Sequence, residues 1–210
     1  TNLKRFTMDS IVKKSKFEIA SKTKVSRQEA EEAVKTLIKW AGDNPFREGL
    51  KETPKRVISA YEEFYAGYKE SAENVLSKTF NDIKGYDEII MLKDIYFNSH
   101  CEHHMVPIIG KVHLAYMPAK RVVGLSKLAR TVEIFAKRLQ TQETMTQQIG
   151  ESIYKYLKPK GVSVYIEAIH QCMTTRGVSK PDVATITTSN LGEFKTKKDY
   201  EAKFLNFIKN

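Results

Sequence analysis

Apolar side chains recur every three or four positions in two segments near the start of the chain, which predicts two amphipathic helices. The first follows Ser26-Arg27-Gln28-Glu29, a sequence with the form of a capping box, and it ends at Gly42. The second begins at Thr53-Pro54, with Thr53 as the expected cap and Pro54 as the first helical residue, and it ends at Gly67. Each helix has a single apolar face, so we expect both to be partly exposed.

After residue 88 the pattern changes to runs of β-branched and aromatic residues with turn residues between them. The expected strands cover residues 88–97, 106–117, 121–125, 161–172 and 183–190. The expected helices cover residues 126–139, 141–157 and 200–208. Hairpins are the natural connection between the first strands, and this order of elements predicts an α+β fold with an antiparallel sheet.

The expected strand over residues 161–172 has an informative alternation of side chains. One face carries four apolar residues in a row: Val162, Val164, Ile166 and Ala168. In a strand, His170 and Cys172 continue that same face. We therefore expect the strand to place His170 and Cys172 side by side at the end of a buried row.

Length and composition suit a folded chain. With 210 residues, of which 41% are hydrophobic, it can bury a core and is expected to form one domain. Half of the net charge of +10 lies in residues 1–25, where seven basic residues stand against two acidic ones. We interpret these residues as a solvated basic arm and expect no nucleic-acid partner. Because no run approaches ~18 apolar residues and no signal-peptide core is visible, we expect a cytoplasmic protein with reduced thiols and no membrane partner.

Both cysteines and four of the five histidines fall in two short stretches, residues 99–104 and 170–172. Packing residues would be scattered, so this concentration indicates one metal site assembled by folding. Cys101 and His104 have C-x-x-H spacing, and Cys172 supplies a third ligand. Thiolates with an imidazole favour zinc, and three protein ligands leave a position for water, as in catalytic zinc sites.

Two alternatives to an open metal site remain at this point. One is a closed structural site that uses both His103 and His104. The other is a pair of unrelated buried cysteines. The spacing alone does not decide which of the two histidines binds the metal.

The segment from Gly124 to Arg130 combines features that bind phosphate. Ser126 stands where a helix would be capped, Lys127 follows it, and Arg130 lies one turn further on. Arg176 adds a cation close to Cys172 in the sequence. The alternative is an ordinary serine cap with solvated cations.

Gln142-Glu143 begins the second helix of the expected pair. An amide next to a carboxylate can donate and accept hydrogen bonds along the edge of a guanine-like ring. The alternative is a first-turn glutamate that stabilises the helix dipole. His113 lies within an expected strand, and we interpret it as structural.

These segments and their flanks occur in the order seen in one enzyme family. They are Arg47–Leu50, Thr53–Arg56, Cys101–Pro107, Gly110–His113, Gly124–Arg130, Arg138–Glu143, His170–Met173, Arg176–Gly177 and Thr187–Ser189. Together they resemble GTP cyclohydrolase I of the zinc-dependent type, over about residues 27–208.

The resemblance implies that GTP and water are converted to formate and 7,8-dihydroneopterin triphosphate, the first step of folate or tetrahydropterin synthesis. It implies one Zn²⁺ per subunit, bound by Cys101, His104 and Cys172. Protons would be moved by His103 and His170, and Ser126 would assist the rearrangement of the sugar. For guanine and the triphosphate it implies Gln142, Glu143, Lys127, Arg130, Arg176 and Arg56.

The resemblance also implies the tunnelling fold, an antiparallel sheet with a helix pair on one face, closed into a multi-subunit barrel. The assembly would be a homodecamer with active sites between subunits. Within one chain we expect a basic arm (residues 1–25), an N-terminal helical region (26–70) and a catalytic region (71–210) in a single domain.

Two other classes of protein remain open. A zinc-stabilised nucleic-acid-binding module would use the basic arm, and its affinity would fall steeply with salt. A structural or regulatory relative would bind GTP or a partner and release no formate.

Overall fold

The computed structural model describes residues 25–80 and 86–210. The chain separates into two compact units, with the boundary between Ser59 and Ala60. All of the predicted basic arm except Val25 lies outside the described residues, and the predicted boundary after residue 70 stays a prediction. Within residues 25–80 and 86–210, every helix is too short or too polar to cross a membrane.

The first unit is helical. Its elements are α2 (Arg27–Trp40), the 3-10 turn η2 (Glu48–Leu50) and α3 (Thr53–Phe64), which continues into the second unit. The predicted capping box is confirmed, because the Ser26 N–H donates to Glu29 Oε2 at 2.7 Å and the Glu29 N–H donates to Ser26 Oγ at 3.2 Å. Gly42 follows the helix with a φ of +93°, as a glycine stop requires. Thr53 is not the cap of α3, since the helix begins at that residue.

The second unit is built on a five-stranded sheet in the order β5-β2-β3-β6-β7. The strands are β2 (Ile90–Cys101), β3 (Pro107–Met117), β5 (Leu139–Gln140), β6 (Gly161–His170) and β7 (Ala184–Gly192). Neighbours are antiparallel except for β5, which runs parallel to the end of β2. The predicted α+β fold with an antiparallel-rich sheet is therefore confirmed.

One predicted strand takes a different place. Residues 121–125 yield only β4 (Val122–Val123), which pairs with β1 (Thr79–Phe80) in a separate two-stranded sheet. Leu125 already belongs to the next helix, with Gly124 as its N-cap, so only Val122–Val123 of this run form a strand.

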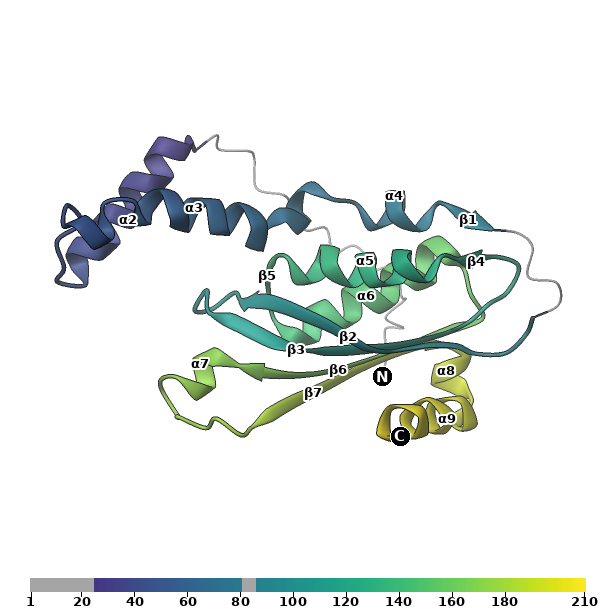
Figure 1. The fold of residues 1–210 in the computed structure, drawn as a ribbon. Coiled ribbons are helices and arrows are strands. Elements are labelled where there is room, and N and C mark those ends of the chain that lie inside the picture. The colour runs from purple at the N-terminus through teal and green to yellow at the C-terminus, as the bar shows by residue number, and fades with distance from the viewer. Residues whose placement is uncertain (1–24, 81–85) are drawn as a thin grey trace, which may run out of the picture. The chain divides into compact units, whose positions relative to one another are not determined.

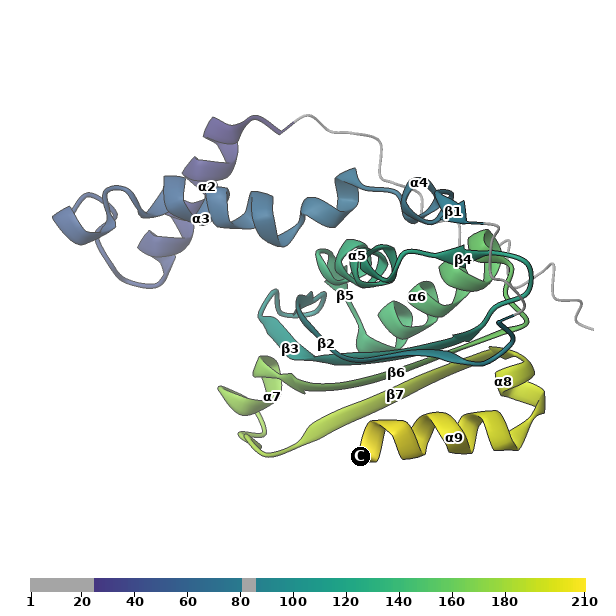
Figure 2. The same cartoon turned by 45° about the vertical axis from the view of Figure 1, so that its right-hand side comes forward.

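Helices cover both faces of the main sheet. The helix pair α5 (Leu125–Ala136) and α6 (Gln142–Leu157) lies on one face, over the buried row of β6 that begins at Val162 (Figure 1). The C-terminal helices α8 (Glu193–Thr196) and α9 (Lys198–Lys209) lie on the opposite face (Figure 2). There Phe194 and Phe204 pack with Ala115 and Met117 in a second, smaller core. The closing helix was predicted, but its position on the other face was not.

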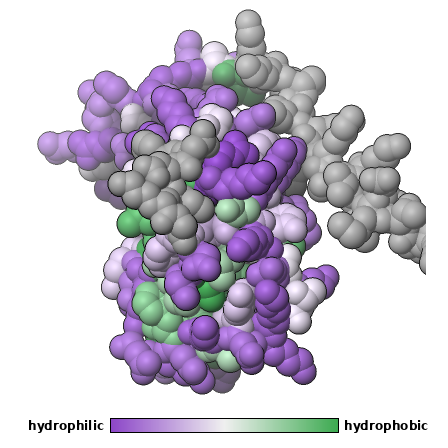
Figure 3. Space-filling view, turned by 90° about the vertical axis from the view of Figure 1, so that its right-hand side faces the viewer, coloured by the Kyte–Doolittle hydropathy of each residue, from purple (hydrophilic) through white to green (hydrophobic). Residues whose placement is uncertain are grey.

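Hydrophilic residues cover most of the surface seen in Figure 3, and hydrophobic residues form only small groups between them. The large apolar side chains of the helix pair, such as Leu128, Met145, Ile149 and Ile153, are fully buried. The main core thus lies between the helix pair and the sheet.

The C-terminal end of α5 is fastened to the preceding turn η3 (Ala66–Lys69), which is followed by α4 (Ala72–Leu76). The Gly67 N–H donates to Lys137 O at 3.1 Å. In return Arg138 donates to Gly67 O through Nε at 3.2 Å and Nη2 at 2.9 Å. The chain leaves this junction directly into β5, which pairs with the end of β2 and so fixes the sheet edge at Cys101.

Candidate metal centre

The turn between β2 and β3 presents a thiol and two imidazoles. It is closed by two backbone hydrogen bonds, from the Cys101 N–H to Val106 O at 2.9 Å and from the Met105 N–H to Cys101 O at 2.8 Å. Met105 has a φ of +55°, in the left-handed region. Cys101 is buried, whereas His103 and His104 are exposed. Cys101 Sγ lies 3.8 Å from His103 Nδ1 and 3.9 Å from His104 Nδ1.

Cys172 reaches the same place by a route that differs from the prediction. β6 ends at His170, and the chain turns at once into the short helix α7 (Gln171–Thr174). The strand alternation therefore holds as far as His170 and is wrong for Cys172. A helical turn carries Cys172 to Cys101.

The ligand atoms of Cys101, His104 and Cys172 all lie within 4.8 Å of one another. Tetrahedral zinc with these ligands needs separations of about 3.5–3.8 Å between ligand atoms, so the group fits the ion after a small contraction. Burial, with the neighbouring Cys101 thiol, raises the pKa of Cys172. Metal binding at this thiol would therefore release a proton.

His103 and Arg176 flank this group. The side chain of His103 is 65% exposed, and its Nε2 lies 3.8 Å from Glu102 Oε1. Arg176 Nη1 lies 3.2 Å from His104 Nε2. Because a guanidinium only donates, His104 Nε2 is the acceptor in this contact. The structure thus brings His103 and Arg176 to the three possible ligands.

His170 is joined to Gln142, the first residue of α6. His170 Nε2 lies 2.8 Å from Gln142 Oε1. Burial lowers the pKa of His170, and Glu143 partly opposes that effect. The side chain of Gln142 is fully buried, and its Nε2 approaches Ile166 O at 3.2 Å, Thr185 O at 2.9 Å and Thr187 Oγ1 at 3.0 Å.

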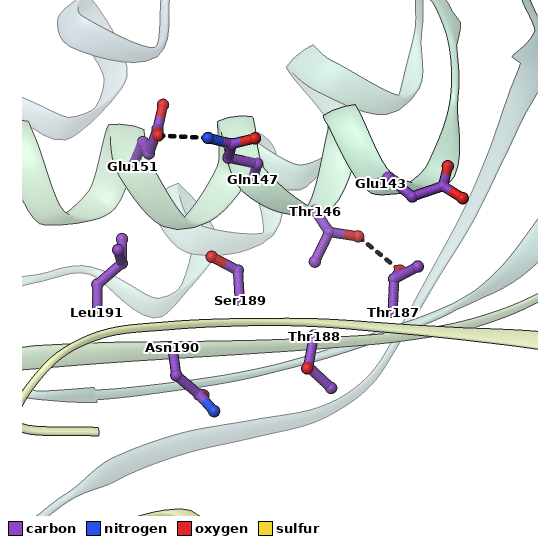
Figure 4. A pocket seen from close by; sticks show the side chains of 9 residues that line it. All are labelled: Glu143, Thr146, Gln147, Glu151, Thr187, Thr188, Ser189, Asn190 and Leu191. Carbon is purple, nitrogen blue, oxygen red and sulfur yellow. Dashed lines mark hydrogen bonds between the residues drawn. The ribbon is translucent and has the colours of Figure 1, made fainter. Parts of the chain in front are cut away.

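A polar pocket of about 390 Å³ extends from Glu143 along the groove between α6 and β7 (Figure 4). Its lining residues are Glu143, Thr146, Gln147, Glu151, Thr187, Thr188, Ser189, Asn190 and Leu191. Thr146 Oγ1 and Thr187 Oγ1 lie 2.7 Å apart in its wall. Glu143 is exposed at one end, where its carboxylate is free to meet a ligand (Figure 4).

Thr146 and Thr187 were not among the predicted site residues. Thr146 lies one helical turn after Gln142 and donates to its backbone oxygen at 2.7 Å. Thr187 belongs to the row of β7 that faces the helix pair, together with Thr185 and Ser189. A polar row on a core-facing strand is the feature that could have identified this wall.

The predicted phosphate-binding residues lie at the other end of α5. Ser126, Lys127 and Arg130 occupy its first turns, Ser126 and Arg130 being exposed. At 1.5 Å per residue, Ser126 stands about 15 Å along the axis from the helix end that leads into β5 and the Cys101 edge. Figures 1 and 2 show α5 running from β4 at one end to β5 at the other, so within one chain its first turn lies away from the sheet edge at Cys101.

Ser126 also differs from its predicted place as a helix cap. α5 begins at Leu125 with Gly124 as the N-cap, so Ser126 is already the second helical residue. Arg56 lies on α3 in the first unit, where its N–H donates to Glu52 O at 3.1 Å.

Fold and site together define a class: an α+β protein with a helix-covered antiparallel sheet and a Cys-His-Cys group suited to a metal. The family model described as GTP cyclohydrolase I matches residues 30–209. The chain therefore belongs to the GTP cyclohydrolase I family of hydrolases.

Curated relatives named GTP cyclohydrolase 1 support this membership along nearly the whole chain. The protein from Maricaulis maris is 56% identical over 189 residues, which is 90% of this chain and 92% of that protein. That from Allorhizobium ampelinum is 52% identical over 97% of this chain and its own full length. That from Brucella suis is 58% identical over 89% of this chain and 87% of its own. A solved structure of an archaeosine synthase QueF-Like protein covers 51% of this chain and 96% of its own, with 15% identity and a TM-score of 0.43.

Proposed function

We propose that this chain converts GTP and water to formate and 7,8-dihydroneopterin triphosphate, the entry reaction of folate or tetrahydropterin synthesis. Family membership supports the reaction. The observation that carries it is the group of three possible metal ligands with His103 beside it. His170, two residues before Cys172, contacts Gln142, and the pocket begins at the next residue, Glu143. Ring opening by water needs an activated water and groups that move protons, and these residues can provide both.

The proposed cofactor is one Zn²⁺ per subunit, held by Cys101, His104 and Cys172. Bound there, zinc would supply a water whose pKa is lowered to about 7. His104 Nδ1 lies 3.9 Å from Cys101 Sγ, and if His104 held the ion through Nδ1, its Nε2 would carry the proton. Nε2 could then no longer accept from Arg176, whose guanidinium would be available for phosphate oxygens.

The remaining residues take the roles that the family resemblance implies. His103 and His170 would transfer protons during imidazole opening, deformylation and ring closure, and Ser126 would assist the sugar rearrangement. Glu143 would accept hydrogen bonds from the edge of guanine, and Gln142 is the second residue implied there. The triphosphate would meet Lys127, Arg130, Arg176 and Arg56.

We further propose that the active form is the family's homodecamer, a tunnelling-fold barrel with active sites between subunits. The 12-residue helix α5 supports this, because Ser126, Lys127 and Arg130 lie in its first turns, away from the helix end that leads to the metal ligands of the same chain. In the part of the chain that the structure describes, β7 is a terminal strand of nine residues that pairs only with β6, as a barrel joined by strand pairing requires. Ile109 and Ile169 pair on the sheet face opposite the helix pair and are 50% and 39% exposed.

The direct test uses purified protein loaded with Zn²⁺ and supplied with GTP. We expect equimolar formate and a fluorescent pterin after oxidation of the product. Removal of the metal by a chelator should abolish both signals, and added Zn²⁺ should restore them. Folded, zinc-loaded protein that binds GTP and releases no formate would instead indicate a regulatory relative.

A further inference from the structure

The side chain of Gln142 is fully buried, and both ends of its amide are engaged by the protein. Two backbone carbonyls, Ile166 O and Thr185 O, face one end at 3.2 and 2.9 Å. His170 Nε2 faces the other end at 2.8 Å. Carbonyl oxygens only accept hydrogen bonds, so the end that meets them must be the NH₂ group. The amide oxygen therefore faces His170.

This orientation determines the proton on the imidazole. An amide oxygen only accepts, so His170 Nε2 has to carry a hydrogen and donate it to Gln142. In the neutral ring the lone pair then lies on Nδ1. We propose that Gln142 is a positioning residue that holds His170 as the Nε2–H tautomer and presents Nδ1 for proton exchange with the substrate. The inference rests on the proposed function, in which His170 transfers protons.

The resemblance implied a different task for Gln142, a contact with guanine. To donate to a ligand, its NH₂ group would have to give up its hydrogen bonds to two backbone carbonyls inside the protein. Glu143 carries no such restraint, because it is exposed at the end of the pocket. The structure thus assigns the imidazole to Gln142 and leaves the guanine edge to Glu143.

The pocket wall supports the amide from the side. Thr187 Oγ1 lies 3.0 Å from Gln142 Nε2 and 2.7 Å from Thr146 Oγ1. Thr146 in turn donates to the backbone oxygen of Gln142. Thr146 and Thr187 line the pocket, so a ligand there would meet the same hydrogen-bonded group that contacts the imidazole of His170.

A double-mutant cycle tests the assignment in the zinc-loaded, assembled enzyme. Gln142→Met keeps the side-chain length and removes every hydrogen bond of the amide. We expect its kcat to fall about 10–100-fold, the usual cost of losing such a positioning partner, with the KM for GTP unchanged within about twofold. If Gln142 acts only through His170, adding Gln142→Met to His170→Ala lowers kcat no further. The proposal would be overturned if the loss of kcat in the double mutant equalled the product of the two single losses. It would also be overturned if Gln142→Met raised the KM for GTP and left kcat unchanged.

Two controls separate positioning from general damage. Gln148→Met, on the same helix, removes one amide hydrogen bond to Gln140 and should leave kcat within about twofold. The ¹⁵N spectrum of histidine-labelled protein should show His170 protonated at Nε2 in the wild type and not held in that form in Gln142→Met. A His170 signal with Nδ1 protonated in the wild type would refute the tautomer assignment.

If Gln142→Met does not fold, Gln142→Asn serves in the same cycle, because it keeps the amide but is too short to reach His170 and both carbonyls together. Zinc content and the thermal midpoint of each variant establish that it is folded. Absence of formate from the wild type contradicts the proposed function. If the wild type turns over normally and the kcat losses of the two single mutants multiply in the double mutant, only the positioning role of Gln142 is contradicted.

Discussion

The two ends of α5 are built differently. At the C-terminal end, Gly67 and Arg138 fasten the helix, and the adjoining site residues Cys101 and Gln142 are buried. At the N-terminal end, Ser126 and Arg130 are exposed, and no side chain among the described residues caps the helix at Gly124. The C-terminal end, next to the possible metal ligands, is thus organised within one chain, whereas the N-terminal end presents the positive end of the helix dipole and exposed polar side chains to an anion. Proton chemistry needs the first kind of site, and a triphosphate can be bound by the second.

The largest effects should come from the C-terminal end of α5, next to the possible metal ligands. There the adjacent residues His103 and His104 are expected to differ in whether their loss also removes the zinc. His104→Ala should lose zinc, with turnover falling about 10³-fold or more because the activated water is lost. His103→Ala should keep the zinc and still lose about 10²–10⁴-fold in turnover, as for a general acid or base. Zinc content by atomic emission, measured beside formate release, checks both. Equal zinc loss in the two variants would contradict the assignment.

A second test asks whether each active site combines the C-terminal end of α5 from one subunit with the N-terminal end of α5 from another. His103→Ala and Lys127→Ala should each be nearly inactive alone. In mixed assemblies refolded together at equal amounts, about a quarter of the sites would combine two intact halves, so about a quarter of wild-type activity should return. The matched control mixes His103→Ala with His170→Ala, which damages the same end in every chain. Recovery in the control, or none in the first mixture, would argue against sites shared between subunits.

A smaller effect on stability is expected when one glycine at each end of α5 is replaced by alanine. At Gly67 an added Cβ would collide with the backbone oxygens of Ile134 and Lys137, so Gly67→Ala should lower the free energy of unfolding by about 1–3 kcal/mol. At Gly124 the nearest atom would be Lys127 Cγ at 3.9 Å, so Gly124→Ala should cost less than about 1 kcal/mol. Urea denaturation of the two variants measures the difference. Similar losses would mean that the ends are equally constrained.

Local patterns in the sequence predicted much of this framework. The capping box at Ser26, the helix pair and the core-facing row of β6 follow from spacing alone, because each depends on neighbours in the chain. The cluster of cysteines and histidines also predicted one metal site with Cys101 and Cys172, and the family resemblance selected His104 as its third ligand. The structure brings these three residues together.

Features that depend on distant neighbours escaped prediction. Cys172 continues the alternation of β6 in the sequence, yet the chain turns into α7 after His170. Ser126 is a favoured capping residue, but α5 begins at Leu125. The burial of Gln142 depends on carbonyls of β6 and β7, which lie 24 and 43 residues further along the chain. No local pattern contains that information.

The spacing of the three metal ligands has a consequence for folding. Cys101 and His104 share one tight turn, so they cost little chain entropy to bring together, whereas Cys172 lies far along the chain. A metal held by all three closes this long loop, as a disulfide would, and restricts the unfolded chain more than a local site does. The ion would then act as a cross-link between the β2–β3 turn and α7, and the protein would resist unfolding in proportion to how tightly it holds its metal.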